Sequence, residues 1–565
     1  MIATPHRWGT RGLAALAGIA AGALTLGVGE LVAALVVEPA AAPYLAVGNT
    51  FVDLTPEWLK SFAIRTFGEN DKQVLLAGMA GVLLVLSAAG GLLELWRRRA
   101  GVAVLLALGA VAVVAAVGRP TATAGWAAPT LAGVVVGAVA LTWLVGRLRA
   151  AVAGRDAPGH DSAAAGGRAS HWGRRRADAA EGRGAEGAAG SVAGREGRSA
   201  GDGAAEVAER PSRRRVLALT AAVAGLAVLT AVGGRRFGQT LAEVREARDA
   251  LRLPAPSDPA PAVPAGTELD VEGMTPFTTP NGDFYRVDTA LDLPRVVPDE
   301  WRLRIHGMVG REVELDFDDV LGLDLVERMI TLTCVSNEVG GELAGNAVWL
   351  GYPLADLLDR AEPGPDADML LSTSVDGFTA STPLDVVRDG RDALLAIGMN
   401  GEPLPVAHGF PARLVVPGLY GYVSATKWVT ELELTRFDRV TAYWTDRGWA
   451  AKAPIKTASR IDVPGSFAEL PAGRNVVAGV AWAQRRGIAG VEVQVDDGDW
   501  RPARLAEEAS ADTWRQWSWP WDAEPGNHTL RVRAIDGAGD RQTDEQAPPF
   551  PDGSSGWHSV VVRVT

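Results

Sequence analysis

Apolar residues are concentrated in the first 235 positions of the chain, where they form long runs of Ala, Leu, Val and Gly. A helix needs roughly 20 apolar residues to cross the hydrocarbon core of a bilayer. Five runs reach or approach that length, and they cover residues 13–37, 74–95, 100–117, 126–145 and 216–232. The pattern predicts a multi-pass membrane protein, with a four-span domain over residues 1–149 and a fifth span over residues 212–235.

Arginines mark one end of each run. They are Arg7, Arg11, Arg97, Arg98, Arg99, Arg147, Arg149, Arg213, Arg214 and Arg215. Because cytoplasmic loops are enriched in Lys and Arg, the pattern predicts a cytoplasmic N-terminus and puts everything after residue 235 on the extracytoplasmic side. Residues 212–217 also resemble a twin-arginine export signal, which serves proteins that fold before export. A plain positive-inside anchor is the alternative.

The segments between and after the runs differ in composition. Residues 150–211 are rich in Gly, Ala, Arg and Asp and nearly free of aromatics, which predicts a disordered cytoplasmic linker. The aromatic residues of the loop 50–72 suggest an amphipathic helix at the outer surface. Residues 236–269 contain a proline-rich stretch and are expected to form an extended stalk. Glu30 is a candidate functional carboxylate within the first run, although we expect the helix to end before it.

Charge and composition exclude several classes of function. The net charge of −12 argues against a nucleic-acid partner, because phosphate binding needs concentrated Lys and Arg. The seven histidines all lie outside the five apolar runs, which excludes a bis-histidine haem within them, and the sequence has no Cys-x-x-Cys-His. We therefore expect electrons to use a separate partner. The single cysteine, Cys334, excludes an intramolecular disulfide.

Cys334 follows a β-prone run at residues 329–333 and precedes a polar, glycine-containing loop at residues 335–341. Such a cysteine is most often a small buried hydrophobe. A glycine-containing loop also lets a ligand approach the main chain closely. The residues around Cys334 leave both interpretations open.

Further motifs follow one another in a fixed order. They are Thr-Pro-Asn-Gly-Asp-Phe-Tyr-Arg at 279–286, Cys-x-x-Asn at 334–337, Trp-x-Gly at 349–351, and the segments 399–405, 408–413, 416–418 and 427–428. In this series the chain resembles the sulfite-oxidase family of molybdopterin enzymes. The resemblance covers roughly residues 275–434 as the cofactor domain and 442–565 as an immunoglobulin-like domain.

The resemblance implies a fold, a cofactor and a set of site residues. After the membrane helices we expect an α+β sulfite-oxidase-like cofactor domain at 270–438 and a β-sandwich at 439–565. The implied cofactor is molybdenum–molybdopterin, with Cys334 as metal ligand, because a thiolate is a soft donor. The implied catalytic residues are Cys334 and Arg286, and the implied cofactor-binding residues are Asn281, Tyr285, Cys334, Asn337, His408, Arg413 and Lys427.

The cationic residues have their own physical argument. Arg413 offers a planar fork suited to a phosphate, and Lys427 offers a point charge. Both could instead be ordinary surface charges, but they lie in an apolar, β-rich stretch where an unpaired charge would be costly.

The terminal region alternates in the manner of a β-sandwich. Its inward-facing residues are expected to be Val491, Val493 and Val495 in one strand and Leu530, Val532 and Ala534 in another. The nearby tryptophans are expected to be packing residues. In the resembled family this domain often supports dimerisation, so the resemblance allows a homodimer.

The substrate pocket departs from the family pattern. Glu338 and Val339 stand where sulfite oxidases have arginines, which makes sulfite itself doubtful. The family's active-site tyrosine aligns with Trp449, although Tyr443 lies nearby. We therefore expect a molybdenum oxidoreductase that carries out two-electron oxo transfer on a small sulfur or nitrogen oxo compound. The alternative is a non-enzymatic membrane receptor with an immunoglobulin-like binding module.

Overall fold

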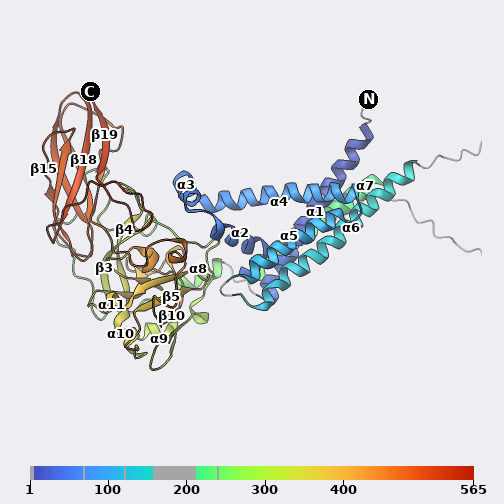
Figure 1. Ribbon diagram of the computed structural model, residues 1–565, viewed down its shortest axis with the longest axis horizontal. Coiled ribbons are helices and arrows are strands. Elements are labelled where there is room, and N and C mark those ends of the chain that lie inside the picture. Colours follow the sequence, from blue (N-terminus) through green and yellow to red (C-terminus); the bar gives the residue numbers. More distant parts are fainter. Residues whose placement is uncertain (1–4, 38, 68–69, 120–121, 157–211, 238–240) are drawn as a thin grey trace, which may run out of the picture.

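The computed structural model describes residues 5–37, 39–67, 70–119, 122–156, 212–237 and 241–565. Most of the linker expected at residues 150–211 lies outside these residues, and positions 150–156 continue a helix instead. Figure 1 shows an elongated helical bundle at one end and the β-rich part of the chain at the other.

The helical bundle contains the five expected spans. Among the described residues, five helices are long and apolar enough to cross a membrane. They are α1 (Pro5–Val36), α4 (Asp71–Trp96), α5 (Ala100–Val117), α6 (Ala127–Asp156) and α7 (Arg213–Phe237). The expectation that the first helix ends before Glu30 is wrong, because α1 continues to Val36.

Small residues let the helices approach one another closely. A Cβ atom on Gly18 of α1 would lie 2.1 Å from the Ser87 carbonyl oxygen of α4. A Cβ atom on Gly91 would lie 2.0 Å from the carbonyl oxygen of Ala14. Such contacts stabilise helix pairs in a bilayer, where no hydrophobic driving force acts between helices.

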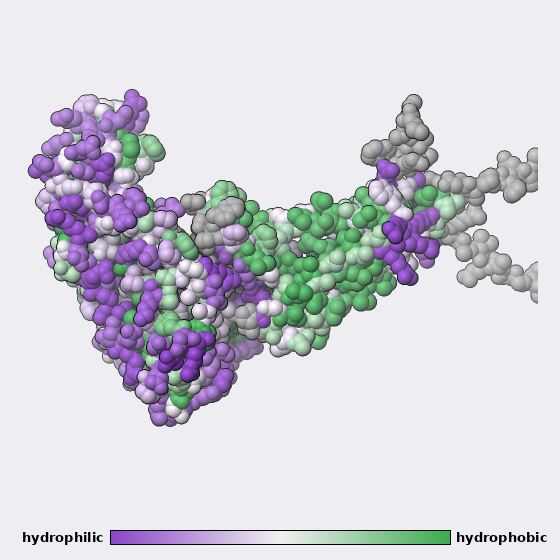
Figure 2. All heavy atoms as spheres, viewed as in Figure 1, coloured by the Kyte–Doolittle hydropathy of each residue, from purple (hydrophilic) through white to green (hydrophobic). Residues whose placement is uncertain are grey.

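The arginine-bearing ends of the spans gather at one end of the bundle. Arg213 Nη2 donates a hydrogen bond to Thr10 Oγ1 at 3.0 Å, and the Arg11 guanidinium lies 5.9 Å from the Trp96 ring centre. Figure 2 shows a hydrophilic patch there, on the far side of the apolar helices from the β-rich domains.

Two shorter helices, α2 (Pro43–Leu54) and α3 (Glu57–Phe67), connect α1 to α4 at the other end of the bundle. They occupy the loop for which the sequence predicts an amphipathic helix. In Figure 1 they lie on the side of the bundle that faces the β-rich domains.

The cofactor-type domain is built on two sheets. One has the strand order β2-β1-β10-β5-β6 and the other has the order β3-β4-β7-β8, with β9 paired to β7. The strands are β1 (Arg302–Gly307), β2 (Val313–Asp316), β3 (Val326–Thr333), β4 (Ala344–Pro353), β5 (Met369–Ser374), β6 (Thr379–Pro383), β7 (Leu394–Met399), β8 (Glu402–Pro403), β9 (Arg413–Val415) and β10 (Val429–Thr435). Short helices α9 (Phe317–Leu321), α10 (Leu354–Asp359) and α11 (Leu384–Val387) follow β2, β4 and β6.

The segment expected to be an extended stalk packs along this domain. It contains helix α8 (Leu241–Ala250), whose Val244 is fully buried. Arg248 Nε donates to the Leu404 carbonyl oxygen at 2.9 Å. Further on, Arg328 forms an ion pair with Asp258 at 2.6 Å. Apolar and ionic contacts therefore hold the segment on the domain in place of a free extended chain.

The C-terminal domain is a sandwich of two sheets, with strand orders β11-β13-β17-β16 and β12-β19-β18-β14-β15. The strands are β11 (Ala458–Val463), β12 (Glu469–Leu470), β13 (Gly473–Trp482), β14 (Ile488–Val495), β15 (Arg501–Pro502), β16 (Arg504–Leu505), β17 (Arg515–Ala523), β18 (Gly526–Asp536) and β19 (His558–Val564). The residues expected to face inward from β14 and β18 pack in its core. The predicted succession of apolar helices, cofactor domain and β-sheet domain is confirmed.

Candidate functional site

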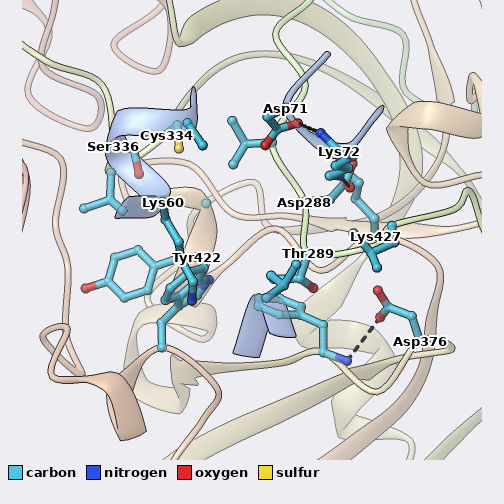
Figure 3. Close-up of a pocket in the computed structure, with 18 of the residues that line it drawn as sticks. Lys60, Asp71, Lys72, Asp288, Thr289, Cys334, Ser336, Asp376, Tyr422 and Lys427 are labelled. Carbon is cyan, nitrogen blue, oxygen red and sulfur yellow. Dashed lines mark hydrogen bonds and ion pairs between the residues drawn. The ribbon is translucent and has the colours of Figure 1, made fainter. Parts of the chain in front are cut away.

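Cys334 lies directly after β3, where the chain turns into a loop. Its backbone N–H donates to the Leu343 carbonyl oxygen at 2.9 Å, and its own carbonyl accepts from the Asn337 N–H at 3.1 Å. These bonds close the loop around the cysteine. The side chain is buried and lines a cavity of about 350 Å³ (Figure 3).

The C-terminal sandwich fixes the strand and loop that carry Cys334. Gln484, which is buried, donates from Nε2 to the Thr331 carbonyl oxygen at 3.0 Å. Ser554 Oγ donates to the Asn337 carbonyl oxygen at 2.6 Å, and Arg460 Nη1 donates to that of Gly341 at 2.8 Å. The position of the thiol therefore depends on both domains.

Gly340 shows how closely the two domains meet at this loop. Its φ angle is +80°, and a Cβ atom there would lie 2.1 Å from the His558 imidazole. Positive φ is costly for residues with a Cβ atom. Glycine is therefore required here by the backbone conformation and by the packing.

Arg413, on β9, supplies a buried positive charge to the cavity. It is 4% exposed, and its Nη1 donates to the His408 carbonyl oxygen at 3.1 Å while the guanidinium stacks over Trp349. Among the ion pairs of the described residues, none involves Arg413. Burial lowers the pKa of this guanidinium to about 10. A buried cation without a carboxylate is unfavourable, so the geometry favours an anionic ligand.

A second group of charges surrounds Asp288. Its Oδ2 lies 3.0 Å from Lys427 Nζ and 2.9 Å from Arg286 Nε, and its Oδ1 pairs with Lys72 at the start of α4. Burial raises the pKa of Asp288, but the three cations outweigh burial and hold that pKa far below its usual range. Burial also lowers the pKa of Lys427 to about 8. Three cations therefore face Asp288, and Arg413 lines the same cavity as Lys72 and Lys427.

Two neutral polar groups lie at the cavity lining or directly behind it. Tyr285 lines it next to Cys334, and burial, followed by the nearby Cys334, raises the pKa of its hydroxyl well above the usual value. His408 faces the Asn281 carbonyl oxygen through Nε2 at 3.2 Å. Burial lowers the pKa of His408 to about 3, so the ring is neutral and Nε2 carries the proton. Its Nδ1 is then a buried acceptor without a partner among the described residues.

The structure brings together four of the predicted site residues, because Cys334, Tyr285, Arg413 and Lys427 all line the cavity. His408 lies behind Arg413, to which its carbonyl oxygen is bonded.

The three other predicted residues support the site from outside the cavity lining. The Asn281 amide bonds to Met399 and Asn400, Asn337 Oδ1 accepts from the Leu343 N–H, and Arg286 holds Asp288. Their direct roles toward a cofactor or substrate stay predictions.

Trp449 and Tyr443, the two candidates for the position of the family's active-site tyrosine, differ in whether they reach the cavity. Trp449 lines the cavity, and its buried Nε1 has no hydrogen-bond partner in the described part of the chain. Tyr443 does not line the cavity and donates from its hydroxyl to Asp53 of α2. Glu338 and Val339 are likewise absent from the lining.

Sequence reasoning missed Asp288 and the wall that the membrane domain contributes. The pair between Lys72 and Asp288 joins positions 216 residues apart. Neither residue belongs to a motif or a periodic pattern that could have indicated this contact.

The chemical groups in and behind the cavity lining all suit one kind of ligand. The lining carries a thiol and a buried guanidinium that lacks a carboxylate partner among the described residues, and His408 behind that guanidinium has a buried imidazole nitrogen left as an acceptor. A thiolate suits a soft metal, the guanidinium suits a phosphate, and the imidazole suits a heterocyclic N–H donor. The site fits a metal carried by a phosphorylated heterocycle.

Comparisons with known proteins agree with this chemistry. Residues 290–444 match the family described as "Oxidoreductase molybdopterin binding domain". The mitochondrial sulfite oxidase of Homo sapiens is 28% identical over 345 residues, which are 51% of this chain and 62% of that protein. The uncharacterized oxidoreductase YuiH of Bacillus subtilis is 32% identical over 150 residues, which are 26% of this chain and 72% of that protein.

A solved structure, the sulfane dehydrogenase SoxCD from Paracoccus pantotrophus, aligns with 52% of this chain and 85% of its own at 24% identity and a TM-score of 0.46. This chain spans only about 62% of the length of the human sulfite oxidase. From the matched domain and the coverage of YuiH, the chain belongs to the sulfite-oxidase family of molybdopterin-binding oxidoreductases.

Proposed function

We propose that this protein is a membrane-anchored, extracytoplasmic molybdenum oxidoreductase that carries out two-electron oxo transfer on a small sulfur or nitrogen oxo compound. Family membership implies the molybdenum cofactor. The observation that carries the proposal is that Cys334 is buried and lines the same cavity as the buried Arg413.

Four residues would hold the cofactor. Cys334 provides the thiolate for the metal, and Arg413 and Lys427 provide cations for the phosphate. His408, behind Arg413, would accept a hydrogen bond from the heterocycle through Nδ1. When bound, the cofactor supplies two-electron redox chemistry and an exchangeable oxygen position.

The remaining lining shapes the space for the substrate. Because burial raises the pKa of Tyr285, its hydroxyl stays protonated at neutral pH and can donate a hydrogen bond to a substrate oxygen. Trp449 offers a second donor through its unpartnered Nε1. Both rings line the cavity that contains Cys334. An oxo compound with a hydrogen-bond-accepting oxygen fits these donors.

The arginine pattern supports the extracytoplasmic location. The arginines singled out in the sequence, from Arg7 to Arg215, belong to the end of the bundle away from the cofactor domain, where Figure 2 shows a hydrophilic patch, whereas Arg119 contacts the cofactor domain at the other end. Under the positive-inside rule that end is cytoplasmic, so the cofactor domain would lie on the opposite side of the membrane.

The export route has a separate test. Arg213 and Arg214 belong to the predicted twin-arginine segment, and they also lie at the arginine-rich end of the bundle. Replacing both by Lys preserves the charge. Loss of the cofactor domain from the extracytoplasmic side would support the twin-arginine route, whereas unchanged localisation would favour a plain anchor.

The central experiment is metal analysis of the purified full-length protein. We expect about one molybdenum per chain, lost in Cys334→Ser and retained in Ser336→Ala, which changes another residue of the cavity lining. Sulfite, S-oxides and N-oxides are then assayed with artificial electron carriers. Folded wild-type protein without molybdenum would contradict the proposal and favour a binding function.

A further inference from the structure

One wall of the cavity is supplied by the membrane domain. Helices α2, α3 and α4 contribute apolar side chains that line the same space as Cys334: Phe51, Leu59, Ala63, Phe67, Val74 and Leu75. Figure 3 shows Lys60 and Lys72 entering this space from the pale blue helices. A molecule in the outer part of the cavity therefore contacts the membrane domain and the cofactor domain together.

Polar contacts hold the two domains together around this wall. Besides the pair between Lys72 and Asp288, Arg119 Nη1 lies 3.0 Å from Asp53 Oδ2 of α2. Arg119 Nη2 also donates to the carbonyl oxygen of Asp376, a cavity-lining residue, at 2.8 Å. Arg119 thus joins α2 to the cofactor domain, and Lys72 joins α4 to the cofactor domain.

The apolar wall continues into the membrane span. Val74 and Leu75 of α4 line the cavity, and further along the same helix Val82 and Val85 are 59% and 64% exposed. These positions lie within a helix long and apolar enough to cross a bilayer. An apolar molecule could therefore move from the lipid to the cavity along a continuous hydrophobic surface.

The described residues offer no second redox centre. They contain no group of three or more His, Cys, Asp or Glu side chains that could hold a metal ion. The only cysteine of the chain is Cys334. A carrier that enters this cavity can therefore exchange electrons with the site directly, without a second centre in the described part of the chain.

We propose that the wall formed by α2, α3 and α4 binds a lipid-soluble two-electron carrier of the quinone class, which occupies the cavity in turn with the oxo substrate. This inference rests on the proposed oxo-transfer function and names its electron partner. A polar group suited to a quinone oxygen lies within the apolar wall. Lys72 keeps further N–H donors beyond the one directed at Asp288.

The overall reaction balances with the quinone as oxidant. The substrate takes one oxygen atom from water and releases two electrons and two protons. The quinone accepts those two electrons and two protons and becomes the quinol. In the opposite direction, quinol reduces the oxo compound and water is released. Because both reactants use one cavity, the two half-reactions alternate and give ping-pong kinetics.

Two phenylalanines provide a matched test. Phe51 and Phe62 are each 50% exposed, but only Phe51 lines the cavity. The full-length protein in phospholipid nanodiscs is irradiated with a short-chain azidobenzoquinone, and the labelled peptides are mapped by mass spectrometry. We expect saturable labelling within residues 51–75 that unlabelled quinone displaces. Phe51→Ala should weaken labelling and raise the KM for quinone roughly three- to tenfold relative to Phe62→Ala, because an aromatic contact is lost.

The outcomes distinguish this inference from the function on which it rests. Turnover with artificial carriers but no saturable quinone labelling would overturn the quinone site and leave the oxo-transfer function standing. Labelling displaced by a long-chain sulfoxide, but not by unlabelled quinone, would assign the wall to the substrate and overturn the inference. Protein without molybdenum or carrier-linked turnover would overturn the proposed function, whatever the labelling.

Discussion

Replacing Asp288 by Asn tests whether this carboxylate stabilises the cations at the junction of the two domains. The substitution keeps the size of the side chain and removes its charge. Lys427 and Arg286 would then each face an amide at about the same distance, and Lys72 of the membrane domain would lose its partner. We expect a large loss of stability.

The magnitude follows from how buried the groups are. The side chains of Asp288 and Lys427 are 6% and 10% exposed, whereas those of Lys72 and Arg286 are 20% and 27% exposed. Removing one partner of a buried ion pair costs about 3–5 kcal/mol. Lys72 and Arg286 can recover part of their hydration, so the Lys427 pair sets the size of the loss. For a domain of this size the Tm should fall by roughly 6–20 °C.

The pH dependence gives the prediction a second signature. The folded-state pKa of Asp288 lies below its unfolded value of about 3.9. Its contribution is therefore fully present above about pH 4 and is lost as the pH falls further. The difference in Tm between wild type and variant should be constant near neutral pH and should narrow below pH 4.

The assay is thermal unfolding of the purified full-length protein in detergent, followed by near-ultraviolet circular dichroism. Asp292→Asn is the control, because Asp292 also pairs with an arginine but its side chain is 41% exposed. Exposed pairs contribute at most about 1 kcal/mol. If Asp288→Asn lowers the Tm no more than Asp292→Asn, the carboxylate does not stabilise the junction and the reasoning fails.

Three further predictions concern Gly340 in the loop after Cys334, the buried His408 imidazole, and Gln484, which bonds to β3. Gly340→Ala should destabilise the fold by about 2–4 kcal/mol, because it adds a clash with His558 to an unfavourable φ. Gly401→Ala is the control and should cost less, since Gly401 has the same φ of +80° but open space around it. Equal losses of Tm in the two variants would exclude a contribution from the clash with His558. Burial lowers the pKa of His408 to about 3, so on acidification below pH 6.5 the unfolded chain takes up a proton before the folded protein does, and the free energy of unfolding falls by up to about 1.4 kcal/mol per pH unit. His408→Gln should make the free energy of unfolding, measured by denaturant titration, less dependent on pH. The remaining pH dependence would be due to His558, whose pKa is lowered to about 4. Gln484→Leu removes its bond to β3 and should cost about 1–3 kcal/mol and lower the molybdenum content per chain; full retention of metal would show that this bond does not position the site.

Hydrophobic patterning and ordered motifs predicted much of the fold from the sequence. Membrane helices depend on long apolar runs, which are local features, so all five spans could be located. The motifs around Cys334 indicated the cofactor domain, and four of the residues chosen from them line one cavity.

Contacts between distant segments were beyond the reach of that reasoning. Asn337 is an example, because its carbonyl oxygen accepts a hydrogen bond from Ser554, which lies 217 positions further along the chain. The choice between Trp449 and Tyr443 also required the structure, since it depends on Asp53 of α2 binding the tyrosine hydroxyl. Such pairings are set by how domains dock and leave no periodic signal in the chain.

The hydrogen bond from Ser554 to the loop after Cys334 has a consequence for the order in which the protein is made. Ser554 follows Asn337 by 217 positions, so the ribosome adds it long after the cysteine has emerged. Gln484 and Arg460, which hold the same strand and loop, are also translated after Cys334. A nascent chain that ends before the sandwich therefore displays the thiol on an unsupported loop. The loop that carries Cys334 should accordingly reach its final position only after the sandwich is complete, on a chain whose first four apolar helices were synthesised much earlier.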